Sequence, residues 1–339
     1  MDKTKGQTKS RLVLIDGNAI MHRAYHALPP LINRNGQLMN AVYGFTTMLF
    51  KVINDLKPQY LIVAFDTGKP TFRQAEYLGY QSKRPHMDDE LSTQFPFVLE
   101  LLEAMEIPVT TKQGFEADDV IGTLARKAVE KGEGRRVKKP SCAKATEGKR
   151  ESESVDEVII VTGDKDLTQL VNEKTKLFMP VKGMSEAEIV DETKVKEKMG
   201  IEPEKVAQLK GLTGDQSDNY PGVPGIGPKT AINLLEKYQT IEKIFQNLKK
   251  HPEEFNILVA EKLKAGEDLA ILSLKLATII TDVPINFDQE KSGFDFSDAI
   301  KEKTVKKLEE FRFKSIVERL KSPEGKKVKK KDESQQSLF

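Results

Sequence analysis

Short apolar runs alternate with helical patterns over the first half of the chain. The long β-branched runs are apolar throughout instead of alternating with polar residues, which is typical of strands in a sheet covered on both faces. The predicted strands are residues 11–17, 60–66, 107–112 and 157–160, and the predicted helices are residues 41–56, 96–105 and 116–131. Strands that alternate with helices in this way predict a mostly parallel α/β sheet flanked by helices.

The remaining pattern divides the chain into segments. The predicted segments are a disordered start at 1–10, an α/β domain at 11–184, a mainly helical domain at 185–320 and a basic disordered tail at 321–339. Residues 67–96 are polar, basic and aromatic, with little apolar periodicity. Residues 131–156 are rich in Lys, Glu, Ser and Gly. Because connections from helix to strand usually run about 2–6 residues, this longer segment is predicted to be a disordered insertion.

Composition excludes several classes of protein. The chain has 339 residues, of which 38% are hydrophobic and 31% charged, so it can bury a core. No apolar run approaches the ~20 residues of a membrane span, and the polar start does not resemble a signal peptide. Cys142 is the only cysteine, which excludes an intrachain disulfide and a zinc cluster. We therefore expect a cytoplasmic, reducing setting.

Acidic residues stand where the predicted strands end. Asp16, Asp66 and Asp164 each follow a buried strand, and ligands collect outside the carboxyl ends of strands in open α/β sheets. Further acids follow nearby, so that nine carboxylates are expected to converge: Asp16, Asp66, Glu116, Asp118, Asp119, Asp164, Asp166, Asp215 and Asp218. Nine such anions would repel one another unless hard divalent cations such as Mg²⁺ or Mn²⁺ were bound among them.

Individual acids also have ordinary interpretations. Asp118 or Asp119 alone fits the first turn of a helix, Asp16 could cap a turn, and the two acids at 215 and 218 could be polar loop residues. Strand-end acids on three separate strands are harder to explain as caps. Two metals about 4 Å apart would serve phosphoryl hydrolysis, although the residues alone leave a single-metal phosphatase open.

The glycine-rich stretch at 221–231 almost matches a nucleotide P-loop. It fails because Pro228 separates Gly227 from Lys229 and because the stretch follows a loop instead of a strand. A tight hairpin between two helices is the better interpretation: Gly225 and Gly227 would let backbone amides approach a phosphate, and the following helix N-terminus would favour the anion. Such a hairpin grips a nucleic-acid backbone without reading bases. The alternative is a plain packing corner.

Cations and aromatic rings are interleaved between residues 67 and 90. The residues are Lys69, Phe72, Arg73, Tyr77, Tyr80, Lys83 and Arg84. This combination suits single-stranded nucleic acid, through phosphate pairing and base stacking. The alternative is an ordinary solvated loop.

Several motifs together resemble the 5′-nuclease (flap endonuclease) family, most closely the 5′→3′ exonuclease domain of bacterial DNA polymerase I. The matching stretches are LIDGNAIMHRAYHAL, AVYGFTTML, VAFDTGKPTFR, GFEADDVIGTLA, VTGDKDLTQL and GLTGDQSDNYPGVPGIGPKTA. The resemblance implies a PIN-like α/β fold, a helical arch at about 67–96 and a helix–three-turn–helix motif. It also implies cleavage of 5′ flaps and 5′ ends of DNA with two Mg²⁺ or Mn²⁺ ions.

The resemblance also assigns residues. It places all nine carboxylates at the metals, with Asp66, Glu116 and Asp118 nearer one ion and Asp164, Asp166 and Asp218 nearer the other. Asp16, Asp119 and Asp215 would act directly or through water. It implies catalytic arch residues Arg73, Tyr80 and Arg84, with Lys83 as a substitute cation. It implies DNA contacts at Arg23, Tyr25, Gly222, Gly225, Gly227, Lys229 and Thr230, with a K⁺ ion at the hairpin.

The chain departs from the family pattern after the arch tyrosine, where the family usually has a lysine. Gln81 occupies that position and cannot supply a positive charge, so we expect a lower rate with the fold unchanged. The insertion at 131–156 is a second departure, with no assigned role.

The chain ends in QQSLF, which resembles the bacterial sliding-clamp motif. Gln335 would donate or accept hydrogen bonds while Leu338 and Phe339 filled an apolar pocket; the alternative is a chance match. No polymerase-sized segment follows residue 320, so a stand-alone, monomeric nuclease is expected. It would remove RNA primers or displaced 5′ flaps in replication and repair. The rival functions are a catalytically weak DNA-junction binder and a PIN-type ribonuclease acting on free RNA.

Overall fold

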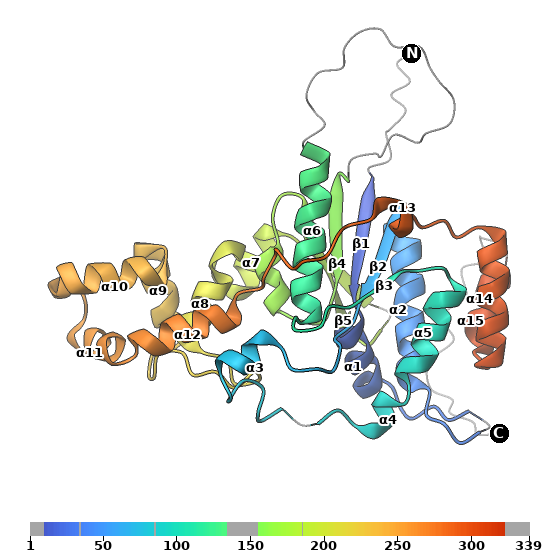
Figure 1. Cartoon of the computed structure of the whole chain (residues 1–339), viewed down its shortest axis with the longest axis horizontal. Helices are drawn as coiled ribbons and strands as arrows, with labels where there is room; N and C mark the ends of the chain where they lie inside the picture. The colour runs from blue at the N-terminus through green and yellow to red at the C-terminus, as the bar shows by residue number, and fades with distance from the viewer. Residues whose placement is uncertain (1–9, 34, 85, 134–154, 185, 323–339) are drawn as a thin grey trace, which may run out of the picture.

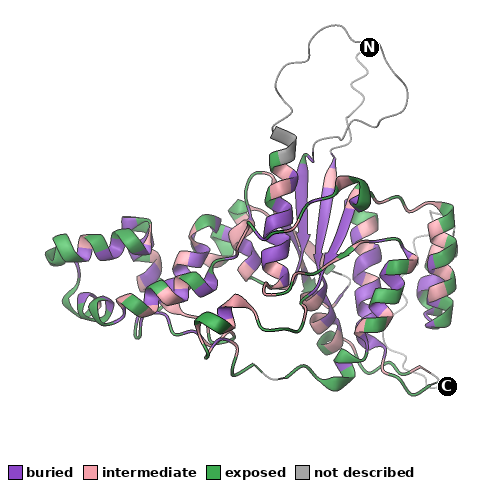
Figure 2. Cartoon of the chain, viewed as in Figure 1, coloured by how far each residue is buried: buried purple, intermediate pink, exposed green. Residues whose placement is uncertain are grey.

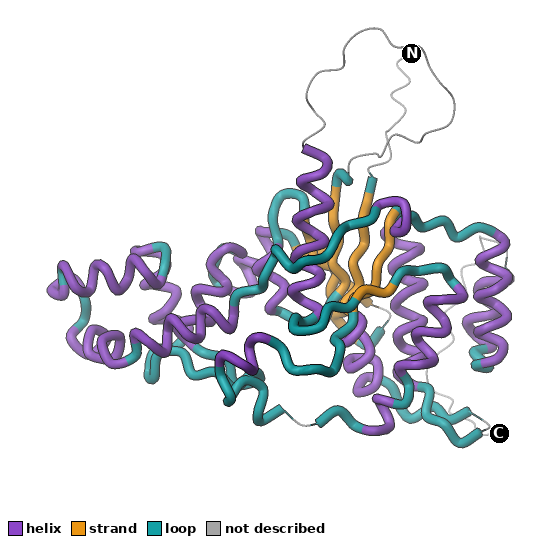
Figure 3. Tube along the Cα trace, in the orientation of Figure 1, coloured by secondary structure: helices purple, strands orange, loops and turns teal. Residues whose placement is uncertain are grey.

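The computed structural model describes residues 10–33, 35–84, 86–133, 155–184 and 186–322. Within these residues, six strands form one sheet in the order β3-β2-β1-β4-β5-β6 (Figure 3). The strands are β1 Arg11–Asp16, β2 Tyr60–Ala64, β3 Val109–Thr110, β4 Glu157–Val161, β5 Thr175–Lys182 and β6 Glu186–Val190. All neighbouring pairs are parallel except β5 and β6. The predicted mostly parallel α/β sheet is confirmed.

Helices cover both faces of the sheet, because alternate apolar residues of each strand point to opposite faces. Leu12 and Leu14 of β1 belong to a core that includes α6 (Ala117–Glu133). Val13 and Ile15 belong to a second core with α1 (Gly17–Ala27), α2 (Asn40–Leu56) and α5 (Phe95–Ala104). Figure 2 shows the strands as buried between these layers.

The helices from α7 to α12 form an extension to one side of the sheet (Figure 1). Its helices are α7 Glu192–Met199, α8 Val206–Thr213, α9 Pro228–Tyr238, α10 Ile241–Lys250, α11 Ile257–Ala265 and α12 Glu267–Ala277, with 3₁₀ turns at Pro203–Lys205 and Pro252–Glu254. A further 3₁₀ turn, Asp166–Leu170, follows β4. Within the described part of the chain, no helix is long and apolar enough to cross a membrane.

The helices after α12 do not remain in this extension. They are α13 Gln289–Ser292, α14 Asp298–Glu310 and α15 Lys314–Lys321. α14 and α15 return to the α/β part, where Phe311 packs edge-on against Phe97 of α5 and Phe313 against Tyr43 of α2. The predicted helical domain at 185–320 is therefore corrected at this end, because Phe311 and Phe313, between α14 and α15, belong to the core that α1, α2 and α5 share with the sheet.

The other predicted boundaries also shift. β6 lies in the sheet and not in the helical part, because the chain turns at Gly183, whose φ is +58°, and pairs back onto β5. Ser10 is buried and its N–H donates to Asp156 at 2.9 Å, so this residue packs with the α/β part instead of belonging to the predicted disordered start. α6 continues to Glu133, and Val155 is buried. Residues 1–9, 134–154 and 323–339 lie outside the described residues. These ranges include most of the predicted insertion at 131–156 and most of the predicted tail at 321–339.

The arch segment, residues 67–96, contains two short helices and the first two residues of α5 among its described residues. The two short helices are α3 Phe72–Glu76 and α4 Asp89–Ser92. The connection between them is a loop along one edge of the molecule (Figure 1). This segment is less helical than the arch that the resemblance implies.

Candidate metal centre and nucleic-acid interface

Asp16 joins two strand ends. It ends β1 and caps α1: its carboxylate accepts the N–H of Ala19 at 2.9 Å and the hydroxyl of Thr162 at 2.8 Å. Thr162 directly follows β4, so the hydrogen bond ties neighbouring strands together at the carboxyl edge. Asp16 is almost fully buried, and this burial, together with the nearby Asp164 and Asp66 charges, raises the pKa of its carboxyl to about 7. Thr162 was not among the predicted residues.

Three further carboxylates gather at the start of α6. The N–H of Ala117 donates to Asp66 at 2.7 Å, which places the end of β2 against the helix N-terminus. Burial raises the pKa of Glu116 to about 7, with Arg73 opposing the rise. Burial also raises the pKa of Asp118 well above its usual range, and the neighbouring acidic charges add to the rise.

Asp166, Asp215 and Asp218 form the tightest acidic group among the described residues. Each offers a carboxylate oxygen, and these oxygens lie within 4.8 Å of one another. Lys210 of α8 lies between two of them: its ammonium donates to Asp215 at 2.6 Å and also to Asp166. Burial and Asp164 raise the pKa of Asp166 to about 6, although Lys210 opposes the rise. Sequence reasoning missed Lys210, whose only signal is its position five residues before Asp215.

The predicted convergence of acids is visible in their electrostatics. Each of the nine carboxylates interacts with at least one other through its charge, from Asp16 on β1 to Asp218 in the loop after α8. The acids therefore share one edge of the molecule, beyond the carboxyl ends of β1, β2 and β4. Their assignment to particular metal ions stays a prediction.

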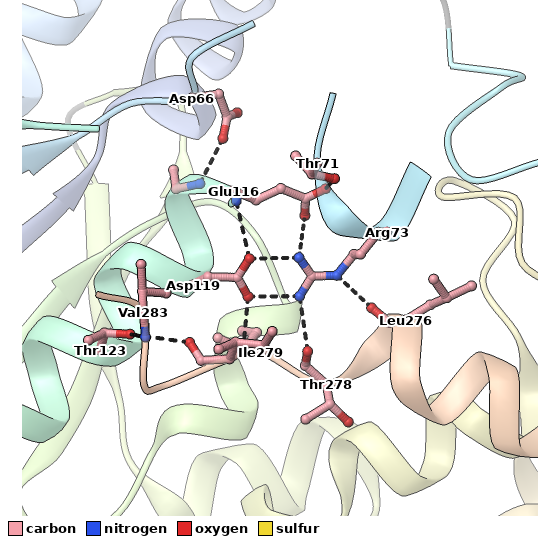
Figure 4. A network of polar contacts seen from close by, with 12 residues as sticks. Asp66, Thr71, Arg73, Glu116, Asp119, Thr123, Leu276, Thr278, Ile279 and Val283 are labelled. Carbon is pink, nitrogen blue, oxygen red and sulfur yellow. Dashed lines mark hydrogen bonds and ion pairs between the residues drawn. The ribbon is translucent and has the colours of Figure 1, made fainter. Parts of the chain in front are cut away.

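One of the nine does not face an open site. Asp119 is completely buried and forms a two-point ion pair with Arg73, at 2.7 and 2.8 Å (Figure 4). Its oxygens also accept the N–H groups of Glu116 at 3.1 Å and Ile280 at 2.8 Å. Each oxygen thus has two donors. These donors use the lone pairs that direct coordination of a metal would need, and the role predicted for Asp119 at the metals, directly or through water, stays a prediction.

Arg73 is equally enclosed. Besides Asp119, its guanidinium donates to the carbonyls of Leu276 at 2.8 Å and Thr278 at 2.9 Å, and to Glu116 at 3.2 Å (Figure 4). The residue is 2% exposed. All of its donors are used inside the protein, and its predicted contact with the scissile phosphate or the threaded strand stays a prediction. It fastens the arch segment to α6 and to the end of α12.

The remaining arch residues differ in exposure. Tyr80 is buried: its hydroxyl donates to Glu116 at 3.2 Å, and its ring stacks on Tyr220 with centroids 6.4 Å apart. Its ring is therefore enclosed by the protein, and its predicted contact with the scissile phosphate or the threaded strand stays a prediction. Lys83 and Arg84 are exposed, and their catalytic roles stay predictions. The charge of Arg84 is close enough to Asp218 to offset part of the burial that raises the pKa of this carboxyl.

The predicted hairpin between two helices is present, with α8 before it and α9 after it. Gly222 has a φ of +61°, and a Cβ there would lie 2.2 Å from the backbone nitrogen of Gly214, so only glycine fits. Gly227 caps α9, and no described atom lies within 4 Å of where its Cβ would be. Lys229 is exposed and Thr230 is half-buried in the first turn of α9. Contact with DNA through these residues and Gly225 stays a prediction.

Two other predicted DNA contacts have partners within the chain. Arg23 donates to the carbonyls of Val181 in β5 at 3.2 Å and of Gly183 in the turn after β5 at 3.4 Å. The hydroxyl of Tyr25 donates to Glu90 of α4 at 3.2 Å. Both side chains link α1 to neighbouring elements, and their DNA contacts stay predictions.

The donor chemistry of the acidic edge fits hard divalent cations. The converging groups are carboxylate oxygens, and burial, with the charges of neighbouring acids adding to it, raises their pKa values. Oxygen-only ligation is what Mg²⁺ and Mn²⁺ prefer. Asp66, Glu116 and Asp118 could hold one ion, and Asp164, Asp166 and Asp218 a second.

Comparison with known proteins identifies the family. Sequence models described as the 5′-3′ exonuclease N-terminal resolvase-like domain and C-terminal SAM fold match residues 11–138 and 201–301. A 5′-3′ exonuclease of Aquifex aeolicus (strain VF5) is 36% identical over 330 residues, which are 97% of this chain and 99% of that protein. The chain belongs to the 5′-3′ exonuclease family. The resemblance found in the sequence is thereby confirmed.

Other members of the 5′-3′ exonuclease family are parts of longer proteins. DNA polymerase I of Bacillus subtilis (strain 168) is 40% identical over 312 residues, covering 92% of this chain but 32% of the polymerase. The chain thus spans about a third of the length of the polymerases that it matches. Among solved structures, the D15 flap endonuclease of bacteriophage T5, in a complex with DNA and metal ions, matches with a TM-score of 0.61 at 20% identity. That match covers 88% of this chain and 98% of the phage chain, and it supports the fold.

The raised pKa values predict an unusual pH dependence of stability. Without metal, Asp16 and Glu116 have pKa values of about 7 and Asp166 of about 6, all above the values for unfolded chains. The folded state then binds more protons than the unfolded state, so stability is lost as pH rises through the folded pKa values. In chelator, we expect the melting temperature to be lower at about pH 8 than at about pH 6.5.

Added Mn²⁺ should reverse this trend, because metal ligands must be deprotonated and bound metal stabilises the folded state. Calorimetric scans at both pH values, with and without Mn²⁺, measure the effect. In chelator, the melting temperature of the Asp16→Asn variant should fall less between about pH 6.5 and about pH 8 than that of the parent. A melting temperature that rises with pH in chelator would contradict the assigned pKa shifts.

Proposed function

We propose that the chain is a structure-specific 5′→3′ exonuclease and 5′-flap endonuclease that hydrolyses DNA, and the RNA of primers, in replication and repair. The observation that carries this proposal is the acidic edge of the sheet, where three carboxylate oxygens lie within 4.8 Å of one another beside a helix–hairpin–helix. The family membership supports it. In the proposal, the α/β part supplies most of the carboxylates and the helical extension supplies the duplex grip.

The proposed mechanism uses two Mg²⁺ or Mn²⁺ ions, which when bound would lower the pKa of a water and neutralise charge on the scissile phosphate. The carboxylates position these ions. The N–H groups around Gly225 and Gly227 and the exposed Lys229 hold the backbone of the duplex, with a K⁺ ion proposed at this hairpin. Lys83 and Arg84 attract the 5′ strand toward the acidic edge. The phage T5 D15 flap endonuclease, which shares the fold, has been solved in a complex with DNA and metal ions.

Cleavage of a 5′-flap DNA in Mg²⁺ tests the proposal. We expect cutting near the junction between single strand and duplex, and no cutting of a 3′-flap DNA or of free single-stranded RNA. Flap binding without cutting would favour the junction-binder alternative. Preferential cutting of the RNA would favour the PIN-type ribonuclease alternative.

The C-terminal tail is proposed to bind a bacterial sliding clamp, although Gln335, Leu338 and Phe339 lie outside the described residues. Titration calorimetry with the last ten residues as a peptide should detect binding to a purified bacterial clamp. A peptide lacking the two terminal apolar residues should not bind, because the apolar pocket would be left empty. If the full chain keeps its affinity after removal of Leu338 and Phe339, the tail is not the clamp ligand. In this proposal the protein acts as a monomer on DNA in the cytoplasm.

A further inference from the structure

One short segment, residues 71–81, holds carboxylates on both sides of the acidic edge. Glu116 accepts hydrogen bonds from three of its side chains: Thr71 at 3.3 Å, and Arg73 and Tyr80 at 3.2 Å each. Figure 4 shows the first two of these donors approaching Glu116 from the arch segment. At the other end of the segment, the amide side chain of Gln81 donates to Asp218 at 3.0 Å. The segment therefore bridges the two groups of predicted metal ligands.

Gln81 is held in place by two hydrogen bonds to one residue. Its backbone N–H donates to the carbonyl of Asp218 at 2.8 Å, so backbone and side chain both bind the same residue. Its φ is +54°, a conformation that side-chain-bearing residues rarely adopt and that surrounding contacts must maintain.

Those surrounding contacts come from the same loop that carries Asp218. The side chain of Asn219 donates to the carbonyl of Gly79 at 2.6 Å and to the hydroxyl of Ser82 at 3.0 Å. Tyr80 and Tyr220 stack with an interplanar angle of 11°. The arch segment and the loop 215–220 are therefore docked over several consecutive residues, with Gln81 at the centre.

The chemistry of an amide suits this position. An ionised carboxylate has about four lone-pair sites, so one donated hydrogen bond orients it and leaves sites for a metal. The amide adds no charge, whereas Lys210 already places a cation between Asp166 and Asp215. A neutral donor thus fixes Asp218 without a further cation competing for it.

We propose that Gln81 is a positioning residue that orients Asp218 for metal binding and thereby couples the arch segment to this half of the metal site. The inference rests on the proposed two-metal function. Partners that orient a metal ligand typically contribute 10–100-fold to metal affinity or activity.

The test compares Gln81→Ala with Gln246→Ala. Gln246 also donates its amide to a carboxylate, Glu242 at 2.9 Å, but on the exposed face of α10 (Ile241–Lys250), far along the helical extension. Three quantities are measured for the parent and both variants. They are Mn²⁺ affinity by titration calorimetry, hydrogen exchange of the backbone amides at 215–220, and single-turnover cleavage of a 5′-flap DNA.

We expect Gln81→Ala to weaken Mn²⁺ binding by about tenfold, to lower the cleavage rate at saturating DNA by a similar factor and to leave KM unchanged. The side chain of Gln81→Asn is one carbon shorter, so its Mn²⁺ affinity and cleavage rate should lie between those of the parent and of Gln81→Ala. Gln246→Ala should match the parent. Exchange at 215–220 should speed up only in the Gln81 variants.

Unchanged Mn²⁺ affinity in Gln81→Ala would overturn the inference, even if the variant lost thermal stability and its amides at 215–220 exchanged faster. The metal and exchange measurements need no cleavage. A parent that binds Mn²⁺ but cuts no DNA would therefore count against the proposed function alone.

Discussion

Asp166→Asn is expected to reduce flap cleavage by at least about 10³-fold, which corresponds to about 4 kcal/mol of transition-state stabilisation. The substitution keeps the shape of the side chain but removes the charge at the tightest acidic group, where Asp166, Asp215 and Asp218 meet. Single-turnover cleavage of a 5′-flap DNA in Mg²⁺ measures the loss. Flap binding, measured by fluorescence anisotropy, should be retained, because the hairpin is unchanged.

Folding should not explain this loss. The pKa of Asp166 is raised to about 6 by burial and by Asp164, so the folded state disfavours its charge at neutral pH. The melting temperature of Asp166→Asn in chelator at about pH 8 should therefore equal or exceed that of the parent. The exposed Asp295→Asn is the matched control and should cut normally. Cleavage within about tenfold of the parent would contradict a metal role for Asp166.

Arg73→Met is expected to lower the free energy of unfolding by about 3–5 kcal/mol, because it leaves Asp119 charged, buried and without its partner. The carbonyls of Leu276 and Thr278 also lose their donor. Urea denaturation measures the change. The double variant Arg73→Met, Asp119→Leu should recover much of the loss, since replacing both charges of a buried pair by apolar side chains is often close to neutral.

The comparison substitution is Arg126→Met on α6. Arg126 pairs with Glu130 at 3.4 Å, but its side chain is 43% exposed, so the loss should stay below about 1 kcal/mol. An outcome in which Arg73→Met folds as stably as the parent but cuts far more slowly would support the role that the resemblance implies, namely contact with the scissile phosphate. The two measurements therefore separate a structural ion pair from a catalytic arginine.

Local rules predicted the acidic edge because each acid is marked by its own neighbourhood. Asp16, Asp66 and Asp164 follow apolar strands, and parallel strands bring their carboxyl ends to one edge. The same rules could not separate Asp118 from Asp119, since both lie in the first turn of α6. The difference arises from Arg73, which is 46 positions away from Asp119, and from Ile280, which is 161 positions away. Such pairings depend on tertiary packing and leave no local pattern.

Gln81 illustrates a second limit of sequence reasoning. In the sequence, Gln81 stands where the family usually has a lysine, so the residue type indicates only that a positive charge is missing there. The structure shows a left-handed backbone conformation and two hydrogen bonds to Asp218, neither of which a residue type alone can indicate. Likewise, the five residues of β6 were assigned to the helical part, because a single short strand after a turn has little period of its own.

Because α14 and α15 return to the α/β part, residue 322, the last described residue, also lies there. These helices pack against α2 and α5, at the opposite end of the longest axis from α9, α10 and α11 (Figure 1). Residue 322 therefore lies far from the hairpin that is proposed to grip the duplex. A protein that binds beside residue 322 would therefore lie at one end of the molecule while the proposed duplex occupied the other. The nuclease would then not have to release its substrate to stay tethered to that protein.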